Sequence, residues 1–213
     1  MKIHIAHLYY DLLNLYGENG NIKALKSVLE KKNDVYVHFL TIDDELDLDK
    51  FDFIYIGMGT EENMHIALKH LIKYKKQVKK YIEDGKIILA TGNSFEMFGN
   101  FIEYHGEKIK ALDIFKYYAV DTKKRIVGEK RINSDIIDKT IIGFENRGSQ
   151  TKGQLNFLEN GYTYKNFYGT YLVGPLLVRN PDLLRYFVKK ITNKDDKINL
   201  RFEEAAYNLK ITN

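Results

Sequence analysis

Apolar and polar positions follow two different rhythms in the first hundred residues of this chain. Short runs of apolar residues predict strands, because a strand buried on both faces of a parallel sheet carries few polar residues. Longer stretches with apolar residues three or four positions apart predict amphipathic helices. The expected elements are strands at residues 2–8, 35–40, 51–56 and 87–90, and helices at residues 21–31 and 61–83. This alternation is typical of a doubly wound, mostly parallel sheet.

Beyond residue 99 the pattern changes to short apolar segments that are separated by glycine or charged turns. The turn His105-Gly106 predicts a hairpin of residues 101–104 and 108–112, and the polar residues 148–161 predict a mobile loop. Further strands are expected at residues 117–121, 125–132, 141–145, 162–164 and 168–173, and further helices at 181–191 and 200–209. The sequence contains no internal repeat and no linker, so we expect residues 1–213 to form one three-layer α/β domain.

Composition and charge exclude several classes of protein. The 213 residues are 44% hydrophobic and 29% charged, as in ordinary globular proteins. A formal net charge of +4 is weak, and the lysines lie on helix faces and in scattered loops, so we expect no nucleic-acid partner. No apolar run reaches the roughly 18 residues of a membrane span, and the N-terminus lacks a signal-peptide pattern. We therefore expect a cytoplasmic protein without membrane insertion.

The absence of cysteine limits the chemistry more sharply than the charge does. Without a thiol the chain has no disulfide, no thiolate metal site and no thiol nucleophile. His65 and His70 stand five residues apart on an expected helix, which is the wrong spacing for a shared metal ion. We expect neither a metal nor another cofactor.

Residues 86–99, KIILATGNSFEMFG, carry the clearest candidate for a functional site. The apolar run ends at Ala90, and Ser94 is placed to cap a helical turn over residues 94–98. A strand that turns sharply into a helix is where α/β enzymes hold a nucleophile, because the turn exposes one side chain at the positive end of the helix. Here Gly92 stands at the turn, and glycine has no side chain that can react.

Several separated segments resemble one family, the class I glutamine amidotransferase domains of the cobyric acid synthase type. The nearest resemblance is to the glutaminase subunit of lipid II isoglutaminyl synthase, which works beside a Mur-ligase-like subunit. The segments keep the order of the family and cover nearly the full chain. They are Leu13-Asn14-Leu15-Tyr16, Gly20-Asn21-Ile22, Gly57-Met58-Gly59, residues 92–99 (GNSFEMFG), Arg125-Ile126-Val127-Gly128, Gly143-Phe144-Glu145-Asn146 and residues 169–175 (GTYLVGP).

The resemblance implies a flavodoxin-like fold and a site from which the chemical groups are missing. In this family a cysteine thiolate attacks the amide of glutamine, a histidine relays the proton and backbone N–H groups hold the oxyanion. The cysteine motif resembles Cys-Gly-Gly-Tyr-Gln-x-x-Gly, which places the cysteine at Gly92 and the glutamine at Glu96. The histidine position is Val173. The resemblance also implies a substrate-contacting arginine at Arg125 and an oxyanion loop at Gly57 and Gly59.

Each remaining candidate residue has a structural interpretation beside its functional one. Ser94 can replace the nucleophile or simply cap the helix, and its base would have to be one of six histidines. Glu96 can bind a cation or an ammonium group, or be favoured only because a carboxylate is stabilised at a helix start. Arg125 can hold a carboxylate with two hydrogen bonds or form an ordinary surface ion pair. The six histidines are His4, His7, His38, His65, His70 and His105.

Three hypotheses follow for the function of the chain. The first is a non-catalytic subunit, in a heterodimer with a Mur-ligase-like enzyme that amidates a cell-wall precursor. The second is an active amidotransferase or hydrolase that uses Ser94. The third is a sensor domain that binds glutamine or a related amino acid through Arg125 and the loop Gly57–Gly59.

Overall fold

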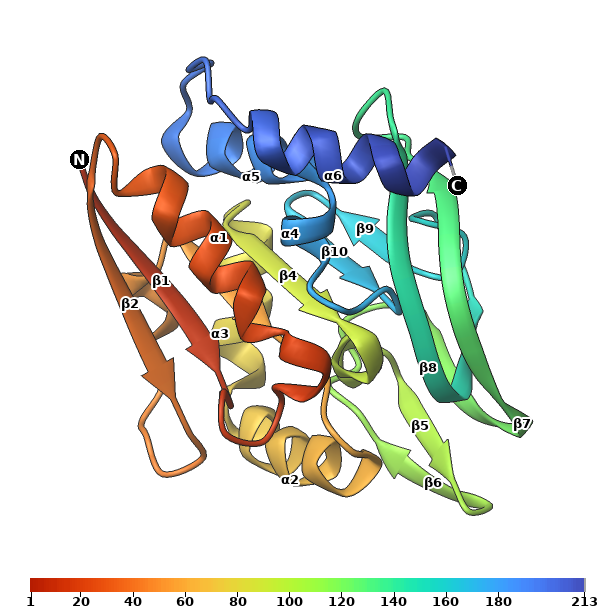
Figure 1. Cartoon of the computed structure of the whole chain (residues 1–213). Coiled ribbons are helices and arrows are strands. Elements are labelled where there is room, and N and C mark those ends of the chain that lie inside the picture. Colours follow the sequence, from red (N-terminus) through yellow and green to blue (C-terminus); the bar gives the residue numbers. More distant parts are fainter. Residues whose placement is uncertain (213) are drawn as a thin grey trace.

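Six strands form the larger of two sheets in the computed structural model, which describes residues 1–212 (Figure 1). Their order is β2-β1-β3-β4-β10-β9, and every neighbouring pair is parallel except β10 and β9. Five parallel strands in this order make the doubly wound, flavodoxin-like arrangement, so the expected fold class is confirmed. The strands are β1 (Lys2–Leu8), β2 (Asp34–Leu40), β3 (Phe53–Ile56), β4 (Ile87–Thr91), β9 (Tyr162–Tyr164) and β10 (Phe167–Thr170).

Helices cover both faces of this sheet and give the molecule its three layers (Figure 1). On one face, α1 (Asn19–Leu29) and α5 (Pro181–Thr192) pack against the side chains of β1, β3 and β4. On the other face, α2 (Glu61–Leu71) and α3 (Lys75–Glu83) pack against the alternate side chains of the same strands. Successive residues of a strand point to opposite faces, which is why a fully apolar run such as β3 serves two cores.

The carboxyl ends of β1, β3, β4 and β10 meet at one edge of the sheet. Because β2 and β3 lie on opposite sides of β1, the segments that follow β1 and β3 lead to helices on opposite faces of the sheet, and folds of this kind bind ligands at such a point. The segment after β1 contains the 3-10 helix η1 (Leu15–Gly17), and η4 (Gly92–Phe98), another 3-10 helix, follows β4 directly. The predicted oxyanion loop and the two positions that have lost their catalytic residues all lie at this edge of the sheet. Gly57 and Gly59 follow β3, Gly92 begins η4, and Val173 follows β10.

A second sheet of four strands, which the sequence did not predict as a separate unit, lies beside the first (Figure 1). The hairpin expected around His105-Gly106 is present as β5 (Phe101–Tyr104) and β6 (Glu107–Lys110). The other two strands, β7 (Tyr117–Asn133) and β8 (Thr140–Gly153), form a long antiparallel hairpin. The loop predicted for residues 148–161 is therefore wrong in its first part. A strand pair that is exposed to water carries polar residues, and their pattern looks like a loop.

Three other expectations differ from the structure. The single helix predicted over residues 61–83 is two helices, because a 3-10 turn, η3 (Ile72–Tyr74), separates α2 from α3. The strand predicted at residues 168–173 ends at Thr170. The sequence also predicts an exposed acidic connection at residues 43–49, but Leu46 and Leu48 within it are buried. The remaining elements are the 3-10 turn η2 (Leu48–Lys50), the short helix α4 (Leu176–Arg179) and the last helix, α6 (Arg201–Thr212).

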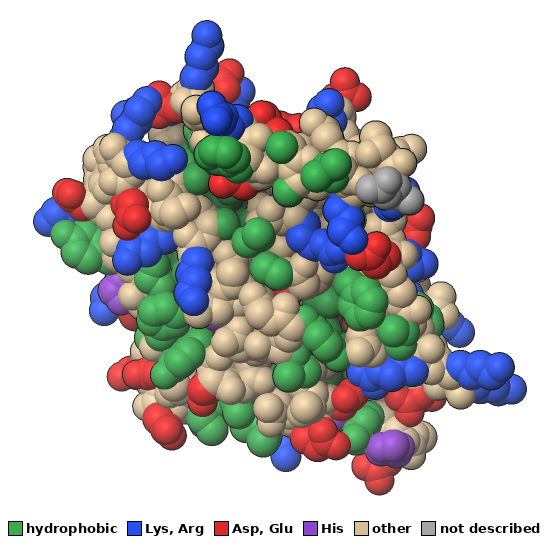
Figure 2. Space-filling model, viewed as in Figure 1, with side chains coloured by type: hydrophobic (Ala, Val, Ile, Leu, Met, Phe, Trp, Pro, Cys, Tyr) green, Lys and Arg blue, Asp and Glu red, His purple; other side chains and the backbone are tan. Residues whose placement is uncertain are grey.

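The surface shows no single basic patch on the face drawn in Figure 2. There, lysine and arginine side chains are scattered over the face and its rim, among acidic ones. Within residues 1–212, none of the helices combines the length and the apolar character that crossing a membrane requires.

Candidate functional site

The turn between β4 and η4 has the backbone geometry of a nucleophile elbow. Gly92 adopts φ +64°, in the left-handed region that side chains other than glycine rarely occupy. A Cβ atom added at Gly92 would lie 2.5 Å from Cβ and 2.6 Å from Cγ of Met58. Both residues are buried. The side chain of Met58 therefore fills the space that a nucleophile at position 92 would need.

The two residues after the elbow bind the ends of β3 and β4 and the loop that follows β3. Asn93 Nδ2 donates to the carbonyl oxygen of Gly59 at 3.0 Å, and Gly59 N–H donates back to Asn93 Oδ1 at 3.3 Å. Ser94 Oγ donates to the carbonyl oxygens of Ile56 and Thr91, at 3.0 and 2.8 Å. The Gly59 N–H group, a candidate oxyanion donor, is thus already engaged by a side chain.

Ser94 has a different role from the helix cap that the sequence predicted. A capping serine accepts a hydrogen bond from a backbone N–H group, whereas Ser94 donates to two carbonyl groups, and Thr91 holds the cap position without a side-chain bond. The cap prediction is wrong because the hydroxyl meets β3, a neighbour in space and not in sequence. Ser94 is fully buried, and no hydrogen bond in residues 1–212 joins it to a histidine.

Packing alone accounts for the two glycines of the loop after β3. A Cβ atom at Gly57 would lie 2.4 Å from the carbonyl oxygen of Leu13, and one at Gly59 would lie 2.7 Å from that of Leu12. Glycine is required wherever backbone approaches backbone so closely. This loop is held between the segment after β1 and the elbow.

Val173, at the histidine position, is fully buried and lies on a bridge between the two sheets. Its N–H donates to the carbonyl oxygen of Phe144 at 2.9 Å, and Phe144 N–H donates to the carbonyl oxygen of Val173 at 3.2 Å. An aliphatic side chain in this place can neither accept nor relay a proton.

A buried carboxylate, Glu18, joins the elbow to the Val173 segment. It accepts hydrogen bonds from the hydroxyl of Tyr55 at 2.6 Å and from the hydroxyl of Thr91, and Gly174 N–H donates to its other oxygen at 2.9 Å. Thr91 precedes Gly92 and Gly174 follows Val173. Burial raises the pKa of the Glu18 carboxyl, against the effect of these three donors. Glu18 was not predicted as a site residue; its only signal in the sequence is a charged residue that lies between two segments of the resemblance.

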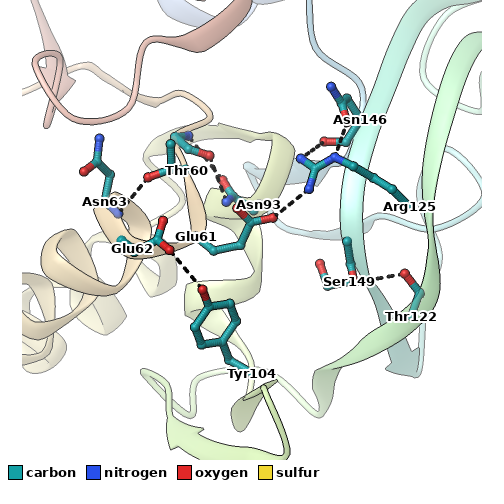
Figure 3. A network of polar contacts seen from close by, with 12 residues as sticks. Thr60, Glu61, Glu62, Asn63, Asn93, Tyr104, Thr122, Arg125, Asn146 and Ser149 are labelled. Carbon is teal, nitrogen blue, oxygen red and sulfur yellow. Dashed lines mark hydrogen bonds and ion pairs between the residues drawn. The ribbon is translucent and has the colours of Figure 1, made fainter.

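Beside the closed elbow lies an open cavity of about 360 Å³. Arg125, Glu96 and Asn93 contribute to its wall, whereas Gly57 and Gly59 do not. Arg125 reaches from β7 across to Glu61 in the first turn of α2, with 3.2 Å between Nη1 and Oε1, and its Nε donates to Asn146 Oδ1 (Figure 3). The structure therefore brings Arg125 and Glu96 to one cavity and leaves the predicted oxyanion loop outside it.

Glu96 is a buried acid at the wall of this cavity. Its Oε1 accepts hydrogen bonds from the hydroxyl of Tyr171 at 2.7 Å and from the hydroxyl of Ser149. Burial raises the pKa of the Glu96 carboxyl from 4.5 to about 7, against the effect of these donors and of the nearby Arg147. Arg147 itself is paired with buried Glu145, with 3.2 Å between Nε and Oε2. One guanidinium thus stands beside two buried carboxyl groups.

Replacing Glu96 by glutamine is expected to stabilise the protein at high pH only. Because its folded-state pKa is raised, Glu96 contributes most to stability below pH 4.5, and this contribution is lost as the pH rises through 7. A glutamine keeps the Oε1 acceptor without the charge. We expect Glu96→Gln to raise the free energy of unfolding by up to about 3 kcal/mol at pH 8 and to change it little at pH 4.5.

Urea denaturation of both proteins at the two pH values measures this difference. Glu145→Gln is the matched control, because it removes the charge partner of a buried guanidinium and should destabilise the protein by about 3 kcal/mol at pH 8. A Glu96→Gln variant that is less stable than the parent at pH 8 would contradict the raised pKa.

Fold and site together define a class I glutamine amidotransferase-like domain. The chain belongs to the family of CobB/CobQ-like glutamine amidotransferase domains, whose model matches residues 4–181, so the resemblance seen in the sequence is confirmed. It is similar to the lipid II isoglutaminyl synthase (glutamine-hydrolyzing) subunit GatD of Streptococcus pneumoniae, with 32% identity over 201 residues, 85% of this chain and 77% of that protein. The protein of the same name from Staphylococcus aureus is 33% identical over 206 residues, 89% of this chain and 84% of its own length.

Solved structures of glutamine amidotransferases share the fold at low sequence identity. One matches with a TM-score of 0.57 and 13% identity over 88% of this chain and 98% of its own. Another, from Thermotoga maritima, matches with a TM-score of 0.55 and 10% identity over 97% of this chain and 92% of its own. At these identities the likeness concerns the fold alone.

Proposed function

We propose that this chain is a non-catalytic, glutaminase-like subunit that binds a Mur-ligase-like enzyme, which amidates a cell-wall precursor in the cytoplasm. The two curated relatives are named as glutamine-hydrolyzing subunits of lipid II isoglutaminyl synthase, which supports a role in cell-wall synthesis. The contact of Met58 with the Cβ position of Gly92 carries the non-catalytic part of the proposal. Ammonia for the ligase would then come from solution or from another protein.

Independent features of the site argue against thiol-based glutamine hydrolysis. The chain has no cysteine, and the elbow has no room for a side chain. Val173 supplies no base, and the Gly59 N–H group is already bonded to Asn93. Losing one member of a nucleophile–base pair removes most of the rate, and members of such a pair act together. The expected loss of glutamine hydrolysis therefore rests on several residues and not on a single substitution.

Glutaminase assays, with and without a Mur-ligase-like enzyme from the same organism, test the catalytic side of the proposal. We expect ammonia release at the background rate for the wild type and no change in Ser94→Ala. Release above background that disappears in Ser94→Ala would make the chain an active hydrolase.

Size-exclusion chromatography with the same ligase tests the partner. We expect one complex of the two chains, and a changed rate of ligation when ammonium is supplied as the nitrogen donor. Separate elution together with an unchanged rate would contradict a partner role.

A second candidate function is favoured by the open cavity. Arg125 at its wall presents the group best suited to hold the carboxylate of an amino acid, which supports a sensor domain for glutamine or a related amino acid. The cavity lies beside the closed elbow, so binding there requires no catalytic group. Calorimetry with a panel of amino acids tests this function, and the absence of heat with every one of them would exclude it.

A further inference from the structure

The wall of the cavity is strongly acidic. Four carboxyl groups and one guanidinium contribute to it, which gives a formal charge of −3 when these five are ionised and the two histidines of the wall, His65 and His105, are counted as neutral. The four acids are Glu61, Glu96, Glu103 and Asp121. Arg125, the guanidinium of this wall, forms an ion pair with Glu61, and its side chain is 46% exposed to solvent. A cavity of this charge attracts a cation and repels an anion.

Glu96 adds a second, independent observation. It is only 1% exposed, and both of its hydrogen-bond donors, Ser149 and Tyr171, reach the same oxygen, Oε1. No hydrogen bond from residues 1–212 reaches Oε2, although Glu96 belongs to the cavity wall. The nearest guanidinium, that of Arg147, is paired with Glu145. Glu96 Oε2 is not one of the enclosed polar atoms that lack a partner, so it is open to the cavity and can accept a hydrogen bond from a ligand there.

We propose that the cavity binds a basic amino acid, with its carboxylate on Arg125 and its side-chain ammonium on Glu96. This inference rests on the second candidate function, binding of an amino acid, and does not depend on a ligase partner. It names a different class of ligand from glutamine. The amide of glutamine can donate to Oε2 but brings no charge, whereas an ammonium compensates the carboxylate and forms a charge-assisted hydrogen bond.

Binding of this ligand is linked to a proton. The ammonium must meet an ionised Glu96, so binding at pH 7 should release a fraction of a proton and should tighten between pH 6 and pH 8. The charged and titratable groups that face Glu96 are Arg147 from β8, Glu61 from α2, Tyr117 from β7 and Tyr171 after β10. The hydroxyls of Tyr117 and Tyr171 stay neutral in this range, since burial raises the pKa of both.

Isothermal titration calorimetry at pH 8 with five ligands tests the inference. Lysine and ornithine carry both groups, norleucine lacks the side-chain ammonium, cadaverine lacks the carboxylate, and glutamine has an amide. We expect lysine or ornithine to bind about tenfold or more tighter than the other three, the usual difference between a charged and a neutral hydrogen bond. Titrations at pH 7 in buffers of different ionisation enthalpy measure the released proton.

Variants assign the two contacts. Glu96→Gln should lower the affinity for lysine about tenfold and leave the affinity for norleucine unchanged. Arg125→Met should also lower the affinity for lysine about tenfold, but it should leave the affinity for cadaverine unchanged. Glu83→Gln is the control for charge, because Glu83 is half exposed and pairs with Lys165 outside the cavity. Circular dichroism melting confirms that each variant is folded.

The outcomes separate the inference from the function on which it rests. Glutamine binding as tightly as lysine, or lysine binding unaffected by Glu96→Gln, would overturn the inference and leave an amino-acid sensor intact. No heat with any ligand would overturn both. Neither result bears on the ligase complex, which chromatography tests separately.

Discussion

Replacing Gly92 by alanine is expected to lower the free energy of unfolding by about 3 kcal/mol. Two costs add up at this position. A left-handed backbone costs a residue with a Cβ atom about 1 kcal/mol, and forcing an atom into a packed interior costs about 1–3 kcal/mol more. The clash is severe, because the new Cβ would lie 2.5 Å from Cβ of Met58. Denaturation in urea, with the slope checked for two-state behaviour, measures the loss.

Gly85 provides a matched control for the backbone cost. It has φ +74°, close to that of Gly92, yet an added Cβ would meet nothing within 4 Å. Gly85→Ala should therefore lose only about 1 kcal/mol. An equal loss at both glycines would show that Met58 does not fill the position at the elbow.

Substitutions of Met58 identify the atom that clashes with a side chain at position 92. The closest atom is Cβ, so Met58→Ala keeps the clash, whereas Met58→Gly removes it. In double-mutant cycles, Gly92→Ala combined with Met58→Gly should lose less free energy of unfolding than the sum of the two single losses. Combined with Met58→Ala, the loss should be close to that sum. For the same reason, a thiol placed at position 92 alone would not find the geometry that a nucleophile needs.

Replacing Glu18 by alanine is expected to cost about 3–5 kcal/mol, the largest loss for an acidic residue in this site. The change leaves three buried donors without an acceptor: the hydroxyls of Tyr55 and Thr91 and the N–H of Gly174. Removing one member of a buried polar network lowers the free energy of unfolding by more than the intact network adds to it, because the remaining groups stay buried without partners. Thermal and urea denaturation measure the effect.

Glu30→Ala is the control for removing a carboxylate from the surface. Glu30 lies at the other end of α1, is about half exposed and contacts Lys26 at 4.0 Å, so its loss should change stability by less than about 0.5 kcal/mol. If Glu18→Ala were no more harmful than Glu30→Ala, the Glu18 carboxylate would not be what joins the elbow to the segment of Val173.

Periodicity and turn signals were sufficient for most elements of the first sheet. Each parallel strand is a dense apolar run, and Gly85, with a left-handed backbone, follows the end of α3. The hairpin β7–β8 was harder to predict, because the middle of β7 alternates between exposed and half-buried residues and the last part of β8 is polar. A strand of this kind owes its conformation to its partner, and no local pattern reports the pairing.

The sequence by itself determined the fold class, the absence of a thiol and the glycine and valine at the elbow and histidine positions. Only the tertiary structure decided what fills that site. Met58 meets Gly92 because β3 and β4 are neighbours, and Glu18 bonds Thr91 and Gly174 although 73 and 156 residues separate them. Such contacts depend on the order of strands in the sheet, to which every strand contributes, and no local pattern of side chains encodes them.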